Sequence, residues 1–87
     1  MPKIEIYTTQ TCPYCHAAKA LLERKGAEYE EIHVEGNPEL RQAMMRRANG
    51  RYTVPQIFVG DLHVGGFDDM AALERRGELD PLLAGSA

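Results

Sequence analysis

The N-terminal part of the chain changes from a strand-like to a helical pattern of apolar positions. Ile4 and Ile6 alternate with polar residues, which predicts a strand over residues 3–8. Apolar residues then recur at helical spacing as far as Gly26, a residue type that commonly ends helices, so we expect a helix over residues 13–25. The apolar stripe of this helix consists of Ala17, Ala18, Leu21 and Leu22.

A weaker strand pattern over residues 28–34 precedes a second helical segment. Asn37 and Pro38 suit the N-cap and the first position of a helix, which we expect to run to about Ala48. The predicted inward positions of this helix are Leu40, Ala43, Met44 and Ala48. Because strand and helix alternate up to this point, the pattern favours parallel strands joined by right-handed crossovers.

The second half of the chain predicts a hairpin and then a third helix. Residues 56–59 and 62–64 are strand-like and flank a Gly-Asp dipeptide, whose glycine suits the first central position of a two-residue turn. These two strands are therefore expected to be antiparallel. Asp68 is predicted to cap a helix that runs to about Arg76.

The complete order of elements is βαβαββα, which predicts an α/β fold with a four-stranded mixed sheet. Residues 80–83 are expected to add one short turn, and residues 84–87 to fray. The chain has 87 residues, of which 44% are hydrophobic, and no linker divides it. We therefore expect one small domain over residues 1–87.

Charge and the N-terminal sequence limit the expected partners and location. The net charge of −3 offers no general attraction to nucleic acid. No stretch approaches transmembrane length, and residues 1–5 lack the apolar core of a secretory signal. We therefore expect a cytoplasmic protein with no membrane partner. In that compartment neighbouring cysteines are more often catalytic than structural.

The two cysteines of the chain lie in one short segment, Cys12-Pro13-Tyr14-Cys15. Residues three apart on a helix share a face, with Cβ atoms about 5 to 6 Å apart. A disulfide needs Cα atoms about 4.4 to 6.8 Å apart, so this pair can close and open with little backbone movement. The spacing therefore predicts a reversible dithiol–disulfide pair.

The two sulfurs are expected to have different roles. Pro13 suits the first helical position, which places Cys12 at the N-cap. A thiolate at that position faces unpaired backbone N–H groups and the positive end of the helix dipole, and both favour the ionised form. Cys15 lies one turn inside, where burial keeps its thiol protonated. We therefore predict that Cys12 attacks a disulfide and that Cys15 resolves the product.

Two structural roles for the cysteines are less well supported. A structural zinc site wants four ligands, and the chain has no second Cys-x-x-Cys segment. His16, His33 and His63 are scattered, so no metal site is expected. A static disulfide across so short a loop would remove little entropy from the unfolded chain. The redox role is favoured.

Two further segments narrow the interpretation: Thr53-Val54-Pro55 and the glycine-rich residues 65–69. Together with the cysteine segment, in this order and spacing, they resemble the dithiol class of glutaredoxins, especially the compact bacterial members. The resemblance extends from Ile4 to about Leu83. It implies a thioredoxin fold, a glutathione-binding groove, and glutathione-dependent reduction of protein disulfides and of glutathionylated proteins.

The resemblance assigns the Thr53-Val54-Pro55 segment to the groove, with a cis peptide before Pro55. The backbone N–H and C=O of Val54 would pair with the cysteinyl backbone of glutathione as a strand does. Tyr14 would flank the reactive sulfur. The alternatives are an ordinary proline at the start of a strand and an incidental exposed tyrosine.

Gly66, Phe67 and Asp68 lead into the third helix, where backbone N–H groups can bind the γ-glutamyl carboxylate of glutathione. By the same resemblance, the Asp68 side chain would accept a hydrogen bond from the γ-glutamyl ammonium. The alternative is that Asp68 only caps the helix and that the glycines only end the hairpin.

The chain departs from the family pattern at Thr9. Many relatives have a lysine at this position, three residues before the attacking cysteine, where it pairs with the glycine carboxylate of glutathione. Thr9 can donate a hydrogen bond but carries no charge. We hypothesise that Arg51, with Arg47, takes over part of this role, the alternative being that both arginines are simply solvated.

The predicted function is a glutathione-dependent thiol–disulfide oxidoreductase that works as a monomer, with Cys12 as nucleophile and Cys15 as resolving thiol. One alternative is a redoxin of the same fold that a thioredoxin reductase reduces, which the uncharged Thr9 favours. Another is a dimer that binds an iron–sulfur cluster through Cys12 and external glutathione. Pro13 argues against the dimer, since cluster-binding relatives usually have a glycine in this loop.

Overall fold

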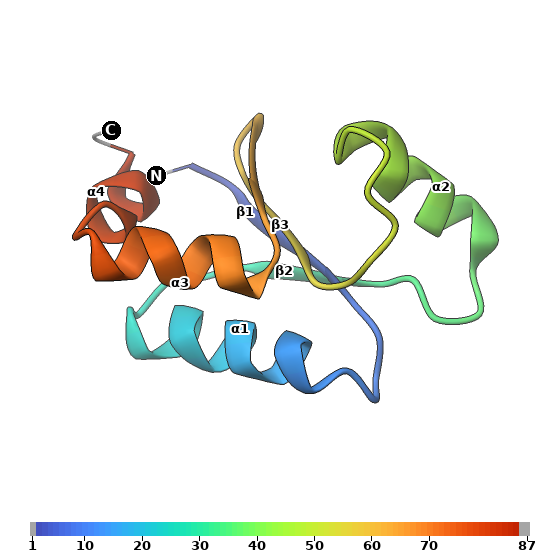
Figure 1. The fold of residues 1–87 in the computed structure, drawn as a ribbon, viewed down its shortest axis with the longest axis horizontal. Coiled ribbons are helices and arrows are strands. Elements are labelled where there is room, and N and C mark those ends of the chain that lie inside the picture. Colours follow the sequence, from blue (N-terminus) through green and yellow to red (C-terminus); the bar gives the residue numbers. More distant parts are fainter. Residues whose placement is uncertain (1, 86–87) are drawn as a thin grey trace.

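The computed structural model describes residues 2–85, and its centre is a four-stranded sheet with helices on both faces (Figure 1). The strands are β1 (Ile4–Thr8), β2 (Glu30–His33), β3 (Gln56–Val59) and β4 (Leu62–Gly65). Their order in the sheet is β2-β1-β3-β4. β1 pairs parallel with β2 and antiparallel with β3, and β3 pairs antiparallel with β4. The predicted mixed sheet is confirmed.

The helices are α1 (Pro13–Arg24), α2 (Pro38–Arg47), α3 (Phe67–Arg75) and α4 (Leu79–Ala84). In Figure 1, α1 and α3 lie side by side, α4 continues from α3, and α2 lies apart from them on the opposite side of the sheet. The helix order follows the prediction, with the short C-terminal turn extended to the helix α4. Within residues 2–85, no helix combines the length and apolar character needed to cross a membrane.

One apolar core lies between the sheet and the helices α1, α3 and α4. Ile6 and Ile57 from the two central strands are fully buried there. They pack in one cluster with Leu22 of α1, Met70 of α3 and Leu79 of α4. Burial of each of these large side chains contributes about 1.5 to 3 kcal/mol. This core fixes α1 and α3 side by side, and both begin near the same end of the sheet.

A smaller core lies on the opposite face, under α2. Tyr7 and Phe58 meet edge to face with ring centroids 5.6 Å apart, and Met44 packs against them. The prediction that Leu40 points inward is wrong, because its side chain is 37% exposed. The residues that bury α2 are Met44 and Ala48, so the C-terminal half of this helix packs on the sheet and its first turn does not.

The start of α3 also differs from the prediction. Gly66, not Asp68, occupies the N-cap. The Asp69 carboxylate accepts a hydrogen bond from the Gly66 backbone N–H at 2.9 Å, so a side chain inside the helix satisfies this N–H. At the C-terminus, Ala84 ends α4 and Gly85 follows in a left-handed conformation. The rest of the segment that was expected to fray, residues 86–87, lies outside the described residues.

Candidate active site

The two thiols lie at the junction between β1 and α1. Cys12 occupies the N-cap of α1 and Pro13 its first position, as predicted. The Cys15 backbone N–H donates a hydrogen bond to the Cys12 Sγ atom at 3.1 Å. Both cysteines are free thiols, and Cys12 is partly exposed whereas Cys15 is fully buried. A dissolved disulfide can therefore reach Cys12 first.

The environment of Cys15 keeps its thiol protonated. Burial raises its pKa from 9.0 to about 12, and the hydrogen bond with Cys12 acts in the same direction. A hydrogen bond with the Thr9 backbone and the charge of Lys19 act against this rise. At neutral pH Cys15 is therefore a thiol, which fits a group that reacts second.

The loop before β3 faces Cys12. The Val54–Pro55 peptide bond is cis, as the resemblance implied. The Cys12 thiol donates a hydrogen bond to the Val54 carbonyl oxygen, with 3.6 Å between sulfur and oxygen. The buried Gln56 side chain donates a hydrogen bond from Nε2 to the Thr53 carbonyl at 3.0 Å, which fixes this loop to the start of β3.

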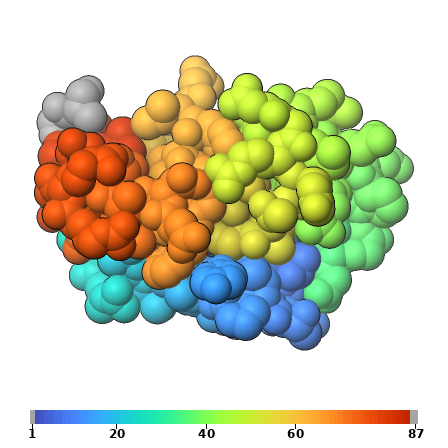
Figure 2. Space-filling view, in the orientation of Figure 1, coloured from blue at the N-terminus to red at the C-terminus, as the bar shows by residue number. Residues whose placement is uncertain are grey.

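A groove of about 300 Å³ opens beside this loop. Figure 2 shows the blue start of α1, the yellow loop before β3 and the orange start of α3 next to one another on one face of the molecule. The lining residues are Tyr14, Arg51, Thr53, Val54, Pro55, Gly66, Phe67, Asp68 and Asp69. The groove thus combines two aromatic rings, the backbone at the start of a helix, one arginine and two carboxylates.

A larger hollow, of about 530 Å³, lies between β4, α3 and α4. Its lining includes Leu62, Leu73 and Leu82, and none of its lining residues contacts a cysteine thiol. The smaller groove is the candidate site, because its lining includes Val54, whose carbonyl accepts the hydrogen bond from the Cys12 thiol. Asp69 contributes to the lining of both.

Arg51 and Asp69 form an ion pair at the edge of the groove. The Arg51 guanidinium donates to the Asp69 carboxylate at 3.0 Å. The Gly66 N–H and then Arg51 lower the pKa of Asp69 below its usual value. Asp69 is not among the site residues predicted from the sequence, although its place as the third residue of α3, where an acidic side chain can cap the helix, is a local signal for it.

Gly65 lets this pair approach the backbone. Its φ of +113° is a conformation that other residues rarely adopt. A Cβ atom there would collide with the Asp69 carboxylate and lie 3.0 Å from the Arg51 guanidinium. A glycine at the end of β4 is therefore required for the ion pair.

The other predicted site residues lie in different places. The Tyr14 ring, 62% exposed, stacks on Phe67 with centroids 6.3 Å apart at the mouth of the groove. Thr9 does not line the groove, and its backbone contacts Cys15 instead. Arg47 is also elsewhere: it donates to the Tyr7 hydroxyl at 2.9 Å and pairs with a β1 carboxylate. Its suggested role beside Arg51 is not supported.

Among residues 2–85, no group of three or more His, Cys, Asp or Glu side chains is arranged to hold a metal ion. The polar groups that contact Cys12 are backbone N–H and C=O groups, and the adjoining groove adds two carboxylates and a guanidinium. These groups suit a small ligand that carries both charges and peptide bonds.

A four-stranded mixed sheet, with a Cys-x-x-Cys pair at its first strand–helix junction and a cis-proline loop facing it, defines the thioredoxin-fold class of redox proteins. The family model described as Glutaredoxin matches residues 4–64. The chain belongs to the glutaredoxin family, and as a member of it is a thiol–disulfide oxidoreductase.

Individual relatives agree with this assignment. The chain is 55% identical over 83 residues to glutaredoxin 3 of Escherichia coli K12, covering 95% of this chain and 99% of that protein. The solution structure of a glutaredoxin from Brucella melitensis is 58% identical with a TM-score of 0.84, covering 95% of this chain and 89% of that one. A buckwheat glutaredoxin–glutathione complex gives a TM-score of 0.88 at 28% identity, covering 98% and 79%.

Proposed function

We propose that this protein uses glutathione to reduce protein–glutathione mixed disulfides and protein disulfides. The observation that carries the proposal is the groove beside Cys12, which joins the Val54 backbone, the start of α3 and Arg51 around one accessible sulfur. The similarity to a glutaredoxin–glutathione complex supports glutathione as the ligand.

Each part of glutathione has a matching group in the groove. The Val54 backbone, next to the Cys12 thiol, is assigned to the cysteinyl backbone, and this pairing would bring the glutathione sulfur to Cys12. The backbone N–H groups at the start of α3 suit the γ-glutamyl carboxylate, and the exposed Asp68 carboxylate suits its ammonium. Arg51 is the cationic group that lines the groove and is assigned to the glycine carboxylate.

Removal of glutathione from a protein needs one cysteine of the enzyme. The Cys12 thiolate attacks the glutathione sulfur of the mixed disulfide, a bond forms between the two sulfurs, and the protein leaves as a thiolate that takes up a proton. A second glutathione thiolate then attacks the same glutathione sulfur. Oxidised glutathione leaves and the Cys12 thiolate is restored.

Reduction of a protein disulfide needs both cysteines. Cys12 forms a mixed disulfide with the target, and Cys15 then loses its proton and attacks the Cys12 sulfur. The target leaves as a dithiol, and the Cys12–Cys15 disulfide is reduced by two molecules of glutathione. The hydrogen bond from the Cys15 backbone N–H to the Cys12 Sγ atom, 3.1 Å long, holds the two residues next to one another for this exchange.

The test is the rate at which a glutathionylated peptide is reduced, with electrons supplied either by glutathione and glutathione reductase or by thioredoxin reductase. We expect turnover with the first supply only. Turnover with thioredoxin reductase alone would instead support the redoxin alternative.

We also propose that the protein is a single-domain monomer that works in the cytoplasm. The small size and the bacterial relatives support this. Anaerobic purification tests the oligomeric state and the iron–sulfur alternative together. A colourless monomer is expected, whereas a coloured dimer would contradict the proposal.

A further inference from the structure

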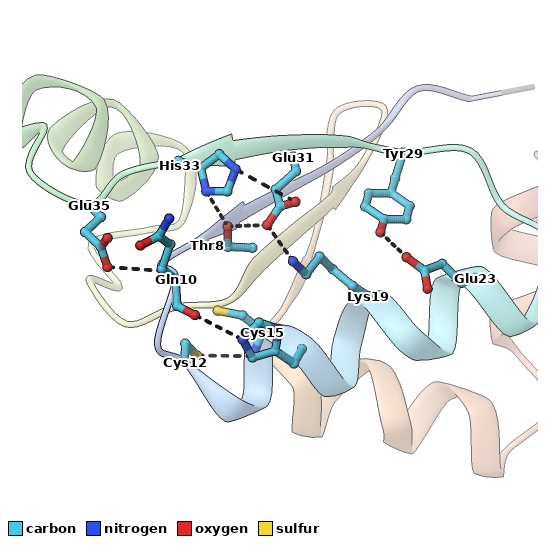
Figure 3. A network of polar contacts seen from close by, with 11 residues as sticks. Thr8, Gln10, Cys12, Cys15, Lys19, Glu23, Tyr29, Glu31, His33 and Glu35 are labelled. Atoms are coloured by element: carbon cyan, nitrogen blue, oxygen red, sulfur yellow. Dashed lines mark hydrogen bonds and ion pairs between the residues drawn. The ribbon is translucent and has the colours of Figure 1, made fainter.

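A half-buried polar cluster lies between α1 and the sheet, behind the cysteine pair (Figure 3). The Lys19 ammonium donates to the Glu31 carboxylate at 2.9 Å, and the Thr8 hydroxyl donates to the same oxygen at 2.7 Å. The side chains of Lys19 and Glu31 are only 22% and 23% exposed. Water therefore screens their charges less than those of a surface pair.

Lys19 and Cys15 share one face of α1. They are four residues apart, and side chains on a helix lean toward its N-terminus, so the Lys19 side chain extends back over the turn that carries Cys15. In Figure 3 the Cys15 and Lys19 side chains both lie on the side of α1 that faces the sheet. The positive charge of Lys19 acts on Cys15 in the direction that favours its thiolate.

Glu31 holds Lys19 in this position as a charged group. Burial by itself would raise the pKa of Glu31, but the Thr8 hydroxyl, Lys19 and His33 together hold it below its usual value. Glu31 is thus a carboxylate at neutral pH and anchors the ammonium group. Thr8 is fully buried in β1, so the anchor has a rigid support.

Formation of the mixed disulfide changes the balance at Cys15. In the free enzyme Cys12 opposes ionisation of Cys15 by a hydrogen bond and by its charge. Once the Cys12 sulfur is bonded to a target, it carries no charge. Burial is then the main effect that raises the pKa of Cys15. The Lys19 charge and the hydrogen bond with the Thr9 backbone still lower that pKa. Of the charged groups in the cluster, Lys19 of α1 acts on Cys15, Glu31 of β2 pairs with Lys19, and His33 of β2 lies beside Glu31.

We propose that Lys19, held in place by Glu31 and Thr8, promotes the resolving step, in which Cys15 attacks the mixed disulfide between Cys12 and the target. The inference rests on the proposed two-cysteine mechanism. In this step the Cys15 proton passes to solvent and the Cys15 sulfur bonds to the Cys12 sulfur. The bond from Cys12 to the target breaks, and the target leaves as a thiolate. The ammonium of Lys19 stabilises the negative charge on Cys15 before the new bond forms.

Stopped-flow mixing with a symmetrical aromatic disulfide separates the two steps. Attack by Cys12 releases one coloured thiolate, and attack by Cys15 on the resulting mixed disulfide releases a second. We expect Lys19→Met to slow the second release about tenfold at neutral pH and to move its pH profile up by about one unit. Lys19→Arg, which keeps the charge, should restore most of the rate.

Two further variants separate charge from structure. Lys19→Gln keeps a hydrogen-bond donor for Glu31 and removes the charge, so it should slow the second release while its melting temperature stays near that of the wild type. Lys25 ends α1 in ion pairs with Glu74 at 2.7 Å and Asp80 at 2.9 Å, at the opposite end from the thiols. Lys25→Met is the matched control and should leave both releases unchanged.

The outcomes distinguish this inference from the proposed function. If Lys19→Met or folded Lys19→Gln keeps the wild-type pH profile of the second release, or if Lys19→Arg fails to rescue, Lys19 has no role in resolution. If the first release is absent from the wild type, Cys12 is not a nucleophile and the proposed function itself fails.

Discussion

Cys12 and Cys15 differ in exposure, and the proposed mechanism gives them different roles. Cys12 is partly exposed at the N-cap of α1, whereas Cys15 is completely buried with its pKa raised to about 12. A substrate disulfide therefore meets Cys12 first. In the proposed mechanism Cys15 attacks the Cys12 sulfur only after that sulfur has bonded to a target.

This division predicts separable cysteine variants. Cys12→Ser should abolish both the reduction of a glutathionylated peptide and that of a protein disulfide. Cys15→Ser should retain removal of glutathione and lose most of the protein-disulfide reduction, because only the second reaction needs a resolving thiol. The two assays on the same preparations check this. Equal loss of both activities in Cys15→Ser would contradict the assignment.

Arg51 is predicted to bind the substrate rather than to stabilise the fold. Its ion pair with Asp69 is about half exposed, and such pairs contribute about 0 to 1 kcal/mol to stability. Arg51→Ala should therefore raise the KM for glutathione about 3- to 10-fold, with little change in kcat, as expected when a charged contact of 1 kcal/mol or so is lost. Steady-state kinetics with varied glutathione measure this.

The matched control is Arg76→Ala, which removes a guanidinium from a similarly exposed pair with Glu78 outside the groove. It should leave the KM for glutathione unchanged. If Arg51→Ala also leaves the glutathione-dependent rate unchanged, Arg51 does not replace the lysine that is absent at Thr9.

The junction between β4 and α3 depends on a close approach between backbone and side chain. Gly65 has φ of +113°, and the Asp69 carboxylate that caps Gly66 occupies the space of a Cβ atom. The conformation at the start of α3, which lines the groove, therefore requires glycine at position 65.

Gly65→Ala should destabilise the protein by about 1 to 3 kcal/mol and weaken glutathione binding, because both the backbone and the Asp69 cap must shift. Urea unfolding and the KM for glutathione measure the two effects. Gly36→Ala is the control: its φ is +68°, but nothing lies within 4 Å of the added Cβ. Gly36→Ala should lower the free energy of unfolding by about 1 kcal/mol and leave the KM for glutathione unchanged. Equal effects of the two substitutions would argue against crowding at Gly65.

The whole fold depends on pH through carboxylates that are stabilised in the native state. Glu31 is one of them: burial acts to raise its pKa, but Thr8, Lys19 and His33 hold it below the ordinary 4.5. The unfolded chain binds a proton on Glu31 near that ordinary value, and the folded chain does so only at lower pH. The contribution of Glu31 to stability is therefore complete above the unfolded pKa and is lost as pH falls through the folded pKa.

We expect Glu31→Gln to be less stable than the wild type at pH near 7 and to approach its stability in the acid range below the ordinary carboxyl pKa. Urea midpoints of the two proteins across this range test the prediction. A constant difference between Glu31→Gln and wild type at every pH would show that Glu31 acts without its charge.

Local patterns predicted the elements well because their causes act within a few residues. Alternation around Ile4 and Ile6, the Cys12-Pro13 start of α1 and the Gly-Asp turn between β3 and β4 each depend on neighbours in the chain. The same patterns failed at Leu40, whose helical spacing indicated an inward side chain. They could not show that the first turn of α2 lies away from the sheet.

The sequence by itself determined the order of strands and helices, the N-cap position of Cys12 and the reactive dithiol spacing, because propensity, capping and turn geometry are local. The tertiary structure alone decided that Asp69 binds Arg51, that Arg47 turns instead to Tyr7, and that Lys19 pairs with Glu31. These contacts join residues from different elements. Their physical cause is the way the two faces of the sheet are packed, which no local pattern contains.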